Sequence, residues 1–444
     1  MNNNISHVDS QKPLSLSRIL KTWLPLAASW MLMSIELPSI NAIVARLPNP
    51  EVSLAAYGGV VFPIALFVEA PVINLLAAST ALSRDWASYQ KLKKITLVMG
   101  VLLMGLHLLI ALTPIFDFIV NVLLQAPAEV IEPARAGLLV LSPWTLAIAF
   151  RRFQQGAMIR HGHSEMVGQT TAVRLVTVAI VLIVGFNVKT IPGPILAGAA
   201  QALGVTAEAV FAGLRIRKIQ PEIKAAPDAP VLTLKHFTSF YLPLALTSSL
   251  WLLWQPLVSA AVFRMPDPLE SGAVWSIITG ILFLFRSPGV AFNEVVVALL
   301  EEHQAIKGLR KFAHYIALIT TAIILLIVLT PLSRLWLQYI AALPPGLTET
   351  GRIALIMGLP IGALSVYISY YQGMIVHNSR TGAVAEAVFS FLISMTVILI
   401  LGIVEQSVKG VYVASTGFAL AHFTQAVWLM IRTRKQRKVL FSEI

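Results

Sequence analysis

The sequence contains no cysteine. Disulfide bonds, thiolate metal sites and cysteine nucleophiles are therefore excluded. Charged residues are also scarce, at 12% of the 444 residues, whereas hydrophobic residues make up 57%. A soluble protein normally carries about a quarter charged residues and could not bury this much apolar surface in one core. The composition therefore indicates a polytopic membrane protein.

The sequence also lacks the motifs of an enzyme. It has no nucleotide-binding glycine loop, no defensible order of catalytic Ser, His and Asp, and no soluble catalytic domain. His161 and His163 form a close pair, but no third ligand follows at a spacing that a metal site would use. We therefore expect no enzymatic activity, no metal site and no organic cofactor.

Long apolar segments dominate what is present. A helix needs roughly 20 apolar residues to cross the hydrocarbon core. Twelve segments meet this length, at about 20–46, 54–80, 95–115, 133–157, 167–188, 192–214, 237–263, 271–299, 312–333, 353–376, 383–404 and 409–431. The sequence therefore predicts an all-α protein with twelve transmembrane helices.

The positive residues predict the orientation of these helices. Lys and Arg near helix ends are retained on the cytoplasmic side. With an inside N-terminus, most of the 33 Lys and Arg residues fall on that side, including the adjacent Arg151 and Arg152. We expect both termini to be cytoplasmic, in an inner membrane. The net charge of +12 is then a topology signal that also attracts anionic lipid, and it requires no nucleic-acid partner.

The chain repeats itself at a nearly constant offset. The letters "LPLA" at 24–27 return at 242–245, and "ARLPNP" at 45–50 matches "FRMPDP" at 263–268. After one residue is lost, further matches follow in order, among them "EAP" at 69–71 with "RSP" at 286–288 and the two "LTP" triplets at 112–114 and 329–331. An ordered series of this kind predicts an internal duplication. Six helices per copy make the two repeats parallel, with a substrate path between them in a central cavity.

The duplication predicts how the chain is divided. The only long polar stretch that contains proline falls between the two copies. The predicted parts are a cytoplasmic segment 1–19, a first lobe 20–218, a linker 219–236, a second lobe 237–434 and a cytoplasmic tail 435–444.

Two charged residues occupy equivalent positions in the second helix of each copy. Glu69 lies near the middle of one apolar segment, and Arg286 is its repeat partner. A charge at the bilayer centre costs about 3 kcal/mol and normally faces the bundle interior or a water-filled cavity. The two residues are therefore either a structural bridge between the halves or an anion contact, Arg286, with Glu69 as its gate or competitor.

A second carboxylate lies beside a proline in the first helix. Pro38 removes a backbone hydrogen bond next to Glu36 and should kink the helix. The second copy keeps a proline, Pro256, but carries the amide Gln255 beside it. Desolvation disfavours the charged form of a carboxyl group, so Glu36 is a candidate ion-coupling group together with Glu69. The alternative is a neutral carboxyl bonded to a freed backbone carbonyl.

Further polar residues within the apolar segments are candidates for the substrate path. They are Asn41, Asn74, Gln255 and Asn293. Arg174, which has threonines on the same side of its helix, is predicted to face Glu386 or Glu208. For Arg174 a structural ion pair is the alternative to substrate binding, because polar groups often hold the helices of a bundle together.

The sequence resembles a known group of transporters. Two six-helix repeats that each open with "LPLA" and a proline-kinked helix resemble the multidrug/oligosaccharidyl-lipid/polysaccharide exporter superfamily, which includes the multidrug and toxic compound extrusion transporters. The stretches "LAAYG" at 54–58, "FVEAP" at 67–71, "PLAL" at 243–246 and "QPLVSAAVFR" at 255–264 are most similar to the progressive ankylosis protein family. Members of that family are associated with export of phosphate-rich or carboxylated anions, and Glu36 would occupy the place of the usual aspartate of the extrusion transporters.

The residues and the resemblance together predict a secondary-active exporter of a small organic or phosphate-containing solute, expected to be an anion. The two lobes would rock about a central cavity, H⁺ or Na⁺ would drive the cycle, and the protein would act as a monomer in the bilayer. The first alternative is a lipid-linked saccharide flippase, which needs a lateral portal and more cavity cations than Arg174 and Arg286. The second is a scaffold or assembly factor, which would not need charges at the bilayer midplane.

Overall fold

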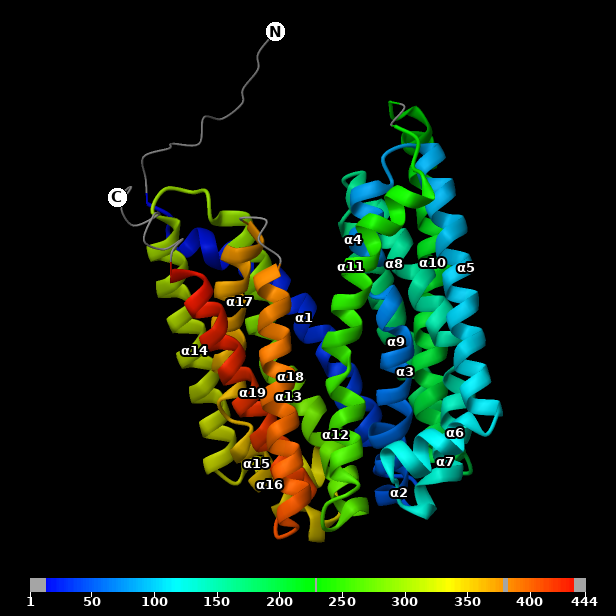
Figure 1. Ribbon diagram of the computed structural model, residues 1–444, viewed down its shortest axis with the longest axis vertical. Coiled ribbons are helices and arrows are strands. Elements are labelled where there is room, and N and C mark those ends of the chain that lie inside the picture. Colours follow the sequence, from blue (N-terminus) through cyan, green and yellow to red (C-terminus); the bar gives the residue numbers. More distant parts are fainter. Residues whose placement is uncertain (1–12, 228–229, 378–381, 435–444) are drawn as a thin grey trace.

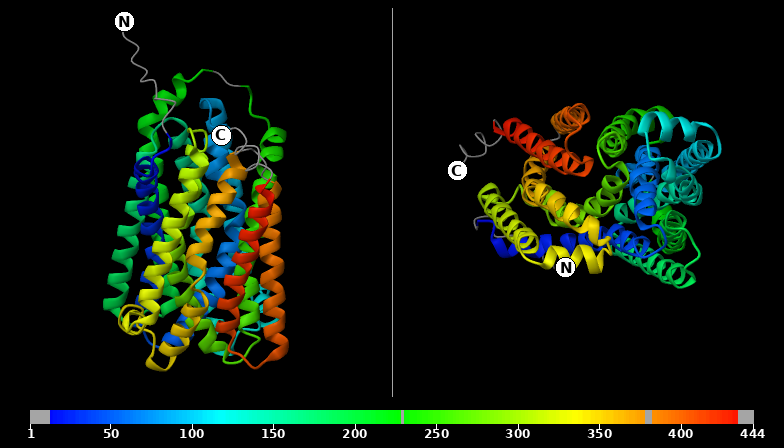
Figure 2. Two further views of the ribbon diagram at one scale, coloured as in Figure 1. Left: turned by 90° about the vertical axis from the view of Figure 1, so that its left-hand side faces the viewer. Right: turned by 90° about the horizontal axis from the view of Figure 1, so that it is seen from below.

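The computed structural model describes residues 13–227, 230–377 and 382–434. Within these ranges every regular element is a helix, and the long helices run along a common axis (Figure 2). Most of the predicted N-terminal segment and the predicted tail 435–444 lie outside the described residues.

Some helices of the first half join end to end into continuous segments, such as Pro50–Leu82 and Ala128–Arg160. The helices of this half are α1 (Leu16–Val44), α2 (Pro50–Leu54), η1 (Ala55–Val61), α3 (Phe62–Glu69), η2 (Ala70–Val72), α4 (Leu75–Leu82), α5 (Trp86–Leu112), α6 (Ile115–Asp117), η3 (Phe118–Leu124), α7 (Ala128–Leu141), α8 (Pro143–Arg160), α9 (Glu165–Val188) and α10 (Gly193–Ala225).

The second half continues in the same way. Its helices are α11 (Leu234–Leu252), α12 (Trp254–Val262), α13 (Pro268–Leu299), α14 (Ala305–Leu329), α15 (Leu332–Leu335), η4 (Trp336–Ile340), α16 (Pro345–Met357), α17 (Ile361–His377), α18 (Gly382–Glu405) and α19 (Gly410–Arg432). Because α10 continues through Pro221 to Ala225, the non-helical connection is shorter than the predicted linker 219–236.

Eleven continuous helical segments of the described chain are long and apolar enough to cross a membrane. The twelfth expected span, 409–431, corresponds to α19, which has 23 residues and packs beside α18. Polar residues such as His422 and Gln425 on α19 make it less apolar than the others. The protein is therefore an all-α polytopic membrane protein, as the sequence predicts.

The backbone repeats certain features at the offset found in the sequence. Non-glycine residues with positive φ recur as three pairs: Asn49 (52°) and Asp267 (54°), Gln125 (54°) and Ala342 (55°), and Lys189 (59°) and Gln406 (52°). The wide π-helical turns η3 and η4 also occupy matching places in the two halves. Non-glycine residues seldom adopt this conformation, so three matched pairs are a structural counterpart of the sequence repeat.

The first helix of each half packs against the other half. Trp23 Nε1 of α1 donates a hydrogen bond to Pro288 O of α13 at 2.9 Å. In the equivalent place, the hydroxyl of Tyr241 on α11 donates to Pro71 O in η2. Asn74 Nδ2 adds a bond to Leu244 O at 2.8 Å. The two halves are therefore joined by reciprocal contacts of their first helices.

Figure 1 shows two groups of helices that diverge at the end that carries the N- and C-termini and approach each other at the opposite end. At that opposite end, glycine permits close contact: a Cβ on Gly58 of η1 would lie only 2.0 Å from Ser276 Oγ of α13. Likewise, a Cβ on Gly59 would lie 2.6 Å from the ring of Phe263. Small residues allow helices in a membrane to approach closely. We call this the closed end, and the end with the termini the open end.

We predict that the open end faces the cytoplasm. Gln90 at the start of α5 and Ser407 before α19 are both exposed and lie at opposite ends. In cells, Ser407→Cys should react with a membrane-impermeant thiol reagent and Gln90→Cys should not, because the native chain has no background thiol. Labelling of position 90 in intact cells, with position 407 protected, would reverse the predicted orientation.

Candidate functional site

Glu208 of α10 is the centre of a buried charge cluster in the first half. Its side chain is completely buried, and its two oxygens lie 3.2 and 3.1 Å from Arg151 Nη1 of α8. Gln155 Nε2, one turn further along α8, donates to Glu208 Oε1 at 3.0 Å. The hydroxyl of Thr171 on α9 donates to the same oxygen at 3.3 Å. The carboxylate therefore joins three helices.

Arg174 of α9 extends the cluster to the first helix. Its Nη2 lies 2.8 and 2.7 Å from the two oxygens of Glu36, and its Nη1 lies 4.0 Å from Glu208 Oε2. Of the two predicted partners, Glu208 is confirmed and Glu386 is wrong, because Glu386 bonds Arg432 near the end of α19. Both oxygens of Glu36 are thus occupied, and α1 is fastened to α9.

Glu69 is the third carboxylate of the cluster, and it differs from the other two. It is 3% exposed, and its Oε2 has no hydrogen-bond partner among the described residues. Arg152, Arg151 and Arg174 are close enough to act on its charge, but none of them forms an ion pair with it in the described part of the chain. The cluster thus contains three carboxylates and three guanidinium groups, so its formal charge is balanced. Glu208 Oε2 also lacks a hydrogen bond, but it lies 3.1 Å from Arg151 Nη1, whereas Glu69 Oε2 has neither a hydrogen bond nor an ion pair among the described residues.

Arg151 lies deeper in the protein than the sequence indicates, and Arg152 beside it is half-buried. The sequence analysis assigned both to the cytoplasmic side, but they lie inside α8, which continues to Arg160, and Arg151 is only 3% exposed. Adjacent arginines near the end of an apolar segment normally mark a membrane boundary. Here Glu208 of α10 pairs with Arg151, and Glu69 of α3 lies close enough to act on the charge of Arg152, which the pattern along one segment does not reveal.

Arg286 does not pair with Glu69 in this conformation. No ion pair between them is present among the described residues, and the Arg286 guanidinium lies instead over the ring of Phe418 on α19, at 5.5 Å from its centroid. Its Nε has no hydrogen-bond partner in the described part of the chain. The structure therefore places Glu69 within the first-half cluster and leaves Arg286 without a carboxylate.

Two polar side chains of α19 accompany Arg286, and the sequence analysis missed both. His422 is fully buried, and its Nδ1 lies 2.7 Å from Phe418 O, so Nδ1 must carry the proton of that hydrogen bond. His422 Nε2 and Gln425 Oε1 have no partner in the described ranges. Their spacing places Phe418, His422 and Gln425 on one helix face. Polar residues at this spacing in an otherwise apolar helix were the available signal.

The other predicted site residues mostly bond the backbone of neighbouring helices. Asn41 Nδ2 donates to Ser276 O at 2.7 Å, and Asn293 Nδ2 donates to Ser369 O at 3.3 Å. Asn74 bonds the backbone of α11, as described above, whereas Gln255 is half-buried on α12. In this conformation the three asparagines hold helices together.

The two histidines near the open end bind different partners. His161 Nε2 contacts Ser83 O at 3.1 Å, whereas His163 Nε2 lies 2.8 Å from Glu222 Oε2. The hydrogen bond with Glu222 raises the pKa of His163. The pair therefore ties the loop between α8 and α9 to α4 and to the extension of α10.

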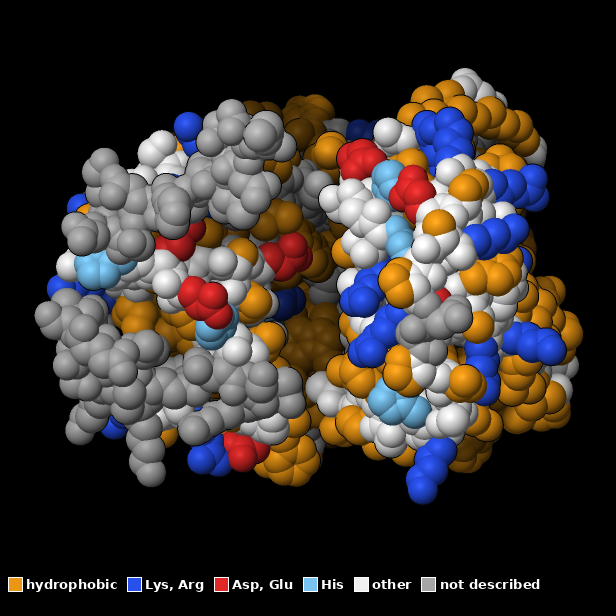
Figure 3. Space-filling view, turned by 90° about the horizontal axis from the view of Figure 1, so that it is seen from above, with side chains coloured by type: hydrophobic (Ala, Val, Ile, Leu, Met, Phe, Trp, Pro, Cys, Tyr) orange, Lys and Arg blue, Asp and Glu red, His pale blue; other side chains and the backbone are white. Residues whose placement is uncertain are grey.

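A hollow lies between the two groups of helices. Figure 3 looks into the open end and shows this hollow with hydrophobic side chains at its floor and charged side chains around its rim. The interior charged residues come from both halves of the chain. Glu36, Glu69 and Arg174 belong to the first half, and Arg286 belongs to the second. A bundle in two parts with charges in its interior is the form of a membrane transporter that moves its substrate between two helical units.

Comparison with solved structures supports this class of fold. An inward-facing multidrug resistance transporter of the MATE family in the MOP superfamily aligns with a TM-score of 0.63 and 15% identity, over 94% of this chain and 96% of that one. A MOP superfamily transporter from Pyrococcus furiosus gives 0.64 and 15%, over 94% and 96%. The inward closed form of the lipid II flippase MurJ gives 0.69 and 14%, over 93% and 87%. The fold is therefore that of MOP superfamily transporters over nearly the whole chain.

The sequence itself defines the family. Residues 9–279, more than half of the chain, match the model of the progressive ankylosis protein (ANKH) family. The chain therefore belongs to this family, as the resemblance in the second and seventh helices predicts.

The buried pair of Arg151 and Glu208 should dominate the stability of the first half. Glu208→Met leaves Arg151 buried without its partner, which we expect to lower the free energy of unfolding by about 3–5 kcal/mol. The double variant Arg151→Met/Glu208→Met should recover most of this loss, because a buried pair can be replaced by apolar residues. The measurement is denaturant unfolding in mixed micelles.

The exposed pair of Arg432 and Glu386 supplies the matched control. Glu386→Gln should cost less than about 1 kcal/mol, as is usual for surface ion pairs. A double variant that is less stable than Glu208→Met would contradict the interpretation of Glu208 as the required counter-ion of Arg151.

Proposed function

We propose that the protein is a secondary-active transporter that exports a small, anionic solute from the cytoplasm by alternating access. The hollow at the open end (Figure 3), between groups of helices that approach each other at the closed end (Figure 1), would be one state of such a cycle. The two lobes, residues 20–218 and 237–434, would rock to open the other end. H⁺ or Na⁺ moving inward would supply the driving force.

The unpaired charge of Arg286 is the observation that carries this proposal. A charge within a membrane protein is costly unless it is paired or faces water. In the first half the guanidinium groups lie among carboxylates, but in the second half the described residues provide Arg286 with only an aromatic ring. An anionic substrate would supply the missing counter-charge, and its departure would restore the observed state.

His422 and Gln425 would complete the substrate contact. Their free acceptor atoms, Nε2 and Oε1, lie on the same helix face as the ring that Arg286 covers. Acceptors of this kind bind hydroxyl groups or the proton of an acidic ligand. The solute that fits best is therefore an anion that also carries hydrogen-bond donors.

Glu69 is the carboxyl group best suited to ion coupling. A coupling group must exchange its ion during each cycle, which requires an oxygen that is not already held. Glu36 has both oxygens bound by Arg174, whereas Glu69 Oε2 is free. Because Glu69 and Arg286 occupy equivalent repeat positions, Glu69 could also compete with the substrate for Arg286 once the halves rock.

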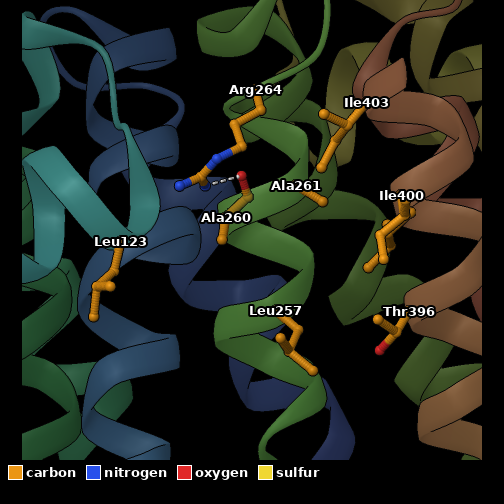
Figure 4. Close-up of a pocket in the computed structure, with 9 residues that line it drawn as sticks. Leu123, Leu257, Ala260, Ala261, Arg264, Thr396, Ile400 and Ile403 are labelled. Carbon is orange, nitrogen blue, oxygen red and sulfur yellow. Dashed lines mark hydrogen bonds between the residues drawn. The ribbon is translucent and has the colours of Figure 1, made fainter. Parts of the chain in front are cut away.

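A lipid-linked saccharide flippase is the second candidate. The observation that favours it is an apolar cleft between the two halves, lined by Leu123 of η3 and by Leu257, Ile400 and Ile403 of α12 and α18 (Figure 4). The chain of a lipid substrate would fit between such side chains. Arg151 and the half-buried Arg152 do not favour a flippase, because Glu208 pairs with Arg151 and Glu69 lies close enough to act on the charge of Arg152.

We expect Arg286→Gln to reduce anion transport at least tenfold. Hydrogen bonds to charged groups contribute about 1.5–3 kcal/mol, and 1.4 kcal/mol corresponds to a factor of ten in affinity. The measurement is uptake by inside-out proteoliposomes of labelled pyrophosphate and citrate, which represent phosphate-rich and carboxylated anions. Arg286→Lys should retain part of the activity.

Arg334→Gln is the control, because Arg334 is exposed at the closed end and, among the residues that the structure describes, pairs only with Glu349. It should transport like the native protein. Undiminished transport of both probes by Arg286→Gln would remove Arg286 as the substrate contact. If native protein moves neither probe but translocates a fluorescent lipid-linked saccharide, the flippase proposal is correct instead.

Glu69→Gln should separate coupling from substrate binding. Glutamine keeps the size of the side chain but cannot titrate or carry charge, so we expect it to abolish uphill accumulation under an imposed H⁺ or Na⁺ gradient while substrate exchange continues. Glu36→Gln should mainly lower stability, because the neutral amide binds Arg174 more weakly than the carboxylate does. Gradient-driven accumulation that survives in Glu69→Gln and disappears in a folded Glu36→Gln variant would transfer the coupling role to Glu36.

A further inference from the structure

Arg46 connects the two halves at the closed end. It follows α1 by two residues, and its guanidinium reaches the C-terminal end of η4 in the other half. Nη1 donates to Ile340 O at 3.0 Å, and Nη2 donates to Tyr339 O. Nη1 also donates to Ala42 O in its own helix at 2.6 Å, which fixes the direction of the side chain.

Arg264 makes a closely similar set of contacts in the opposite direction, with Val122 equivalent to Tyr339 and Leu124 one residue beyond the equivalent of Ile340. It follows α12 and reaches the C-terminal end of η3 in the first half. Nη1 donates to Leu124 O at 3.2 Å, and Nη2 donates to Val122 O at 3.1 Å. Nη1 also bonds Ala260 O on its own helix at 2.6 Å, the bond drawn in Figure 4.

The two arginines are repeat partners, since they are the second residues of "ARLPNP" and "FRMPDP". Their own-helix acceptors, Ala42 and Ala260, have the same offset. Each arginine thus crosses to the equivalent turn of the opposite half. Retention of the whole arrangement in both copies indicates that the contacts act between the halves and do not serve one local loop.

The acceptors suit a guanidinium group. The last carbonyls of a helix lack intrahelical partners and carry the negative end of the helix dipole. The fork of arginine can bond two neighbouring carbonyls at once, which the ammonium group of lysine cannot do in the same geometry. The acceptors are neutral backbone carbonyls and not carboxylates. Water can therefore replace these hydrogen bonds when the halves separate.

We propose that Arg46 and Arg264 are the two latches of the closed end, which hold it shut while the open end admits substrate and which release together when the lobes rock. This inference rests on the proposed alternating-access function. The latches position the halves and do not contact the substrate, and because they are reciprocal, loss of one leaves the other in place.

The test is amide hydrogen exchange of the purified full-length protein in nanodiscs. In Arg46→Gln, exchange should accelerate at least fivefold in 336–342 of the opposite half, with little change in 118–126. In Arg264→Gln the pattern should reverse, and the double variant should show both increases. Arg334→Gln removes a charge at the same end without a contact between halves and should leave both segments unchanged.

Acceleration confined to each arginine's own helix, or none at all, would overturn the proposal, because the cross-half pattern is what a latch requires. If the glutamine variants fail to fold, Arg46→Lys and Arg264→Lys keep the charge and lose the fork. They should give the same crossed pattern at smaller amplitude, and native-like exchange in them would equally overturn it. The exchange experiment needs no substrate. The latch proposal can therefore be rejected while transport is demonstrated, or supported while every transport probe fails.

Discussion

The rest of the structure depends on two hydrogen bonds between the halves, from Trp23 to Pro288 and from Tyr241 to Pro71. Each first helix is fastened to the second helix of the other half, so neither half is a separate bundle. The carbonyls that accept these bonds belong to the prolines of the "EAP" and "RSP" triplets. Each triplet begins with an interior charge, Glu69 in the first half and Arg286 in the second. The contacts that join the halves and the charges in their interior therefore lie within two residues of each other.

The second constraint is the cost of charge in a membrane, and the two halves meet it differently. In the first half, residues from α1, α3, α8, α9 and α10 form a cluster whose formal charges balance. In the second half, Arg286 lies against an aromatic ring, with His422 close by on the same face of α19. A duplicated fold would be symmetrical if only packing mattered. The first half contains a balanced cluster and the second an unbalanced cation. This difference in charge between the halves supports a function that runs in one direction.

Composition and segment length were sufficient to predict the all-α membrane fold, because a span must be long and apolar. The family also followed from the sequence, since "FVEAP" and "QPLVSAAVFR" are contiguous stretches. The repeat predicted equivalent places for Glu69 and Arg286, but equivalence under duplication does not imply contact, and the structure shows Glu69 within the cluster of its own half. Arg151 could not be recognised as buried, because its counter-ion Glu208 comes from a helix that is distant in sequence. His422 and Gln425 were not predicted, although both are polar residues within the apolar segment 409–431.

The central claim is that the two lobes exchange the open and closed ends. Paired spin labels test it most directly, because the native chain contains no cysteine. One pair, Gln90→Cys with Lys307→Cys, spans the open end, and another, Asn121→Cys with Gln338→Cys, spans the closed end at exposed positions. Distance distributions would be recorded by double electron–electron resonance in liposomes, with and without an imposed ion gradient and transported anion. The account predicts that a population appears in which the first distance shortens while the second lengthens. Distances that stay fixed under all conditions, or that lengthen together, would contradict it.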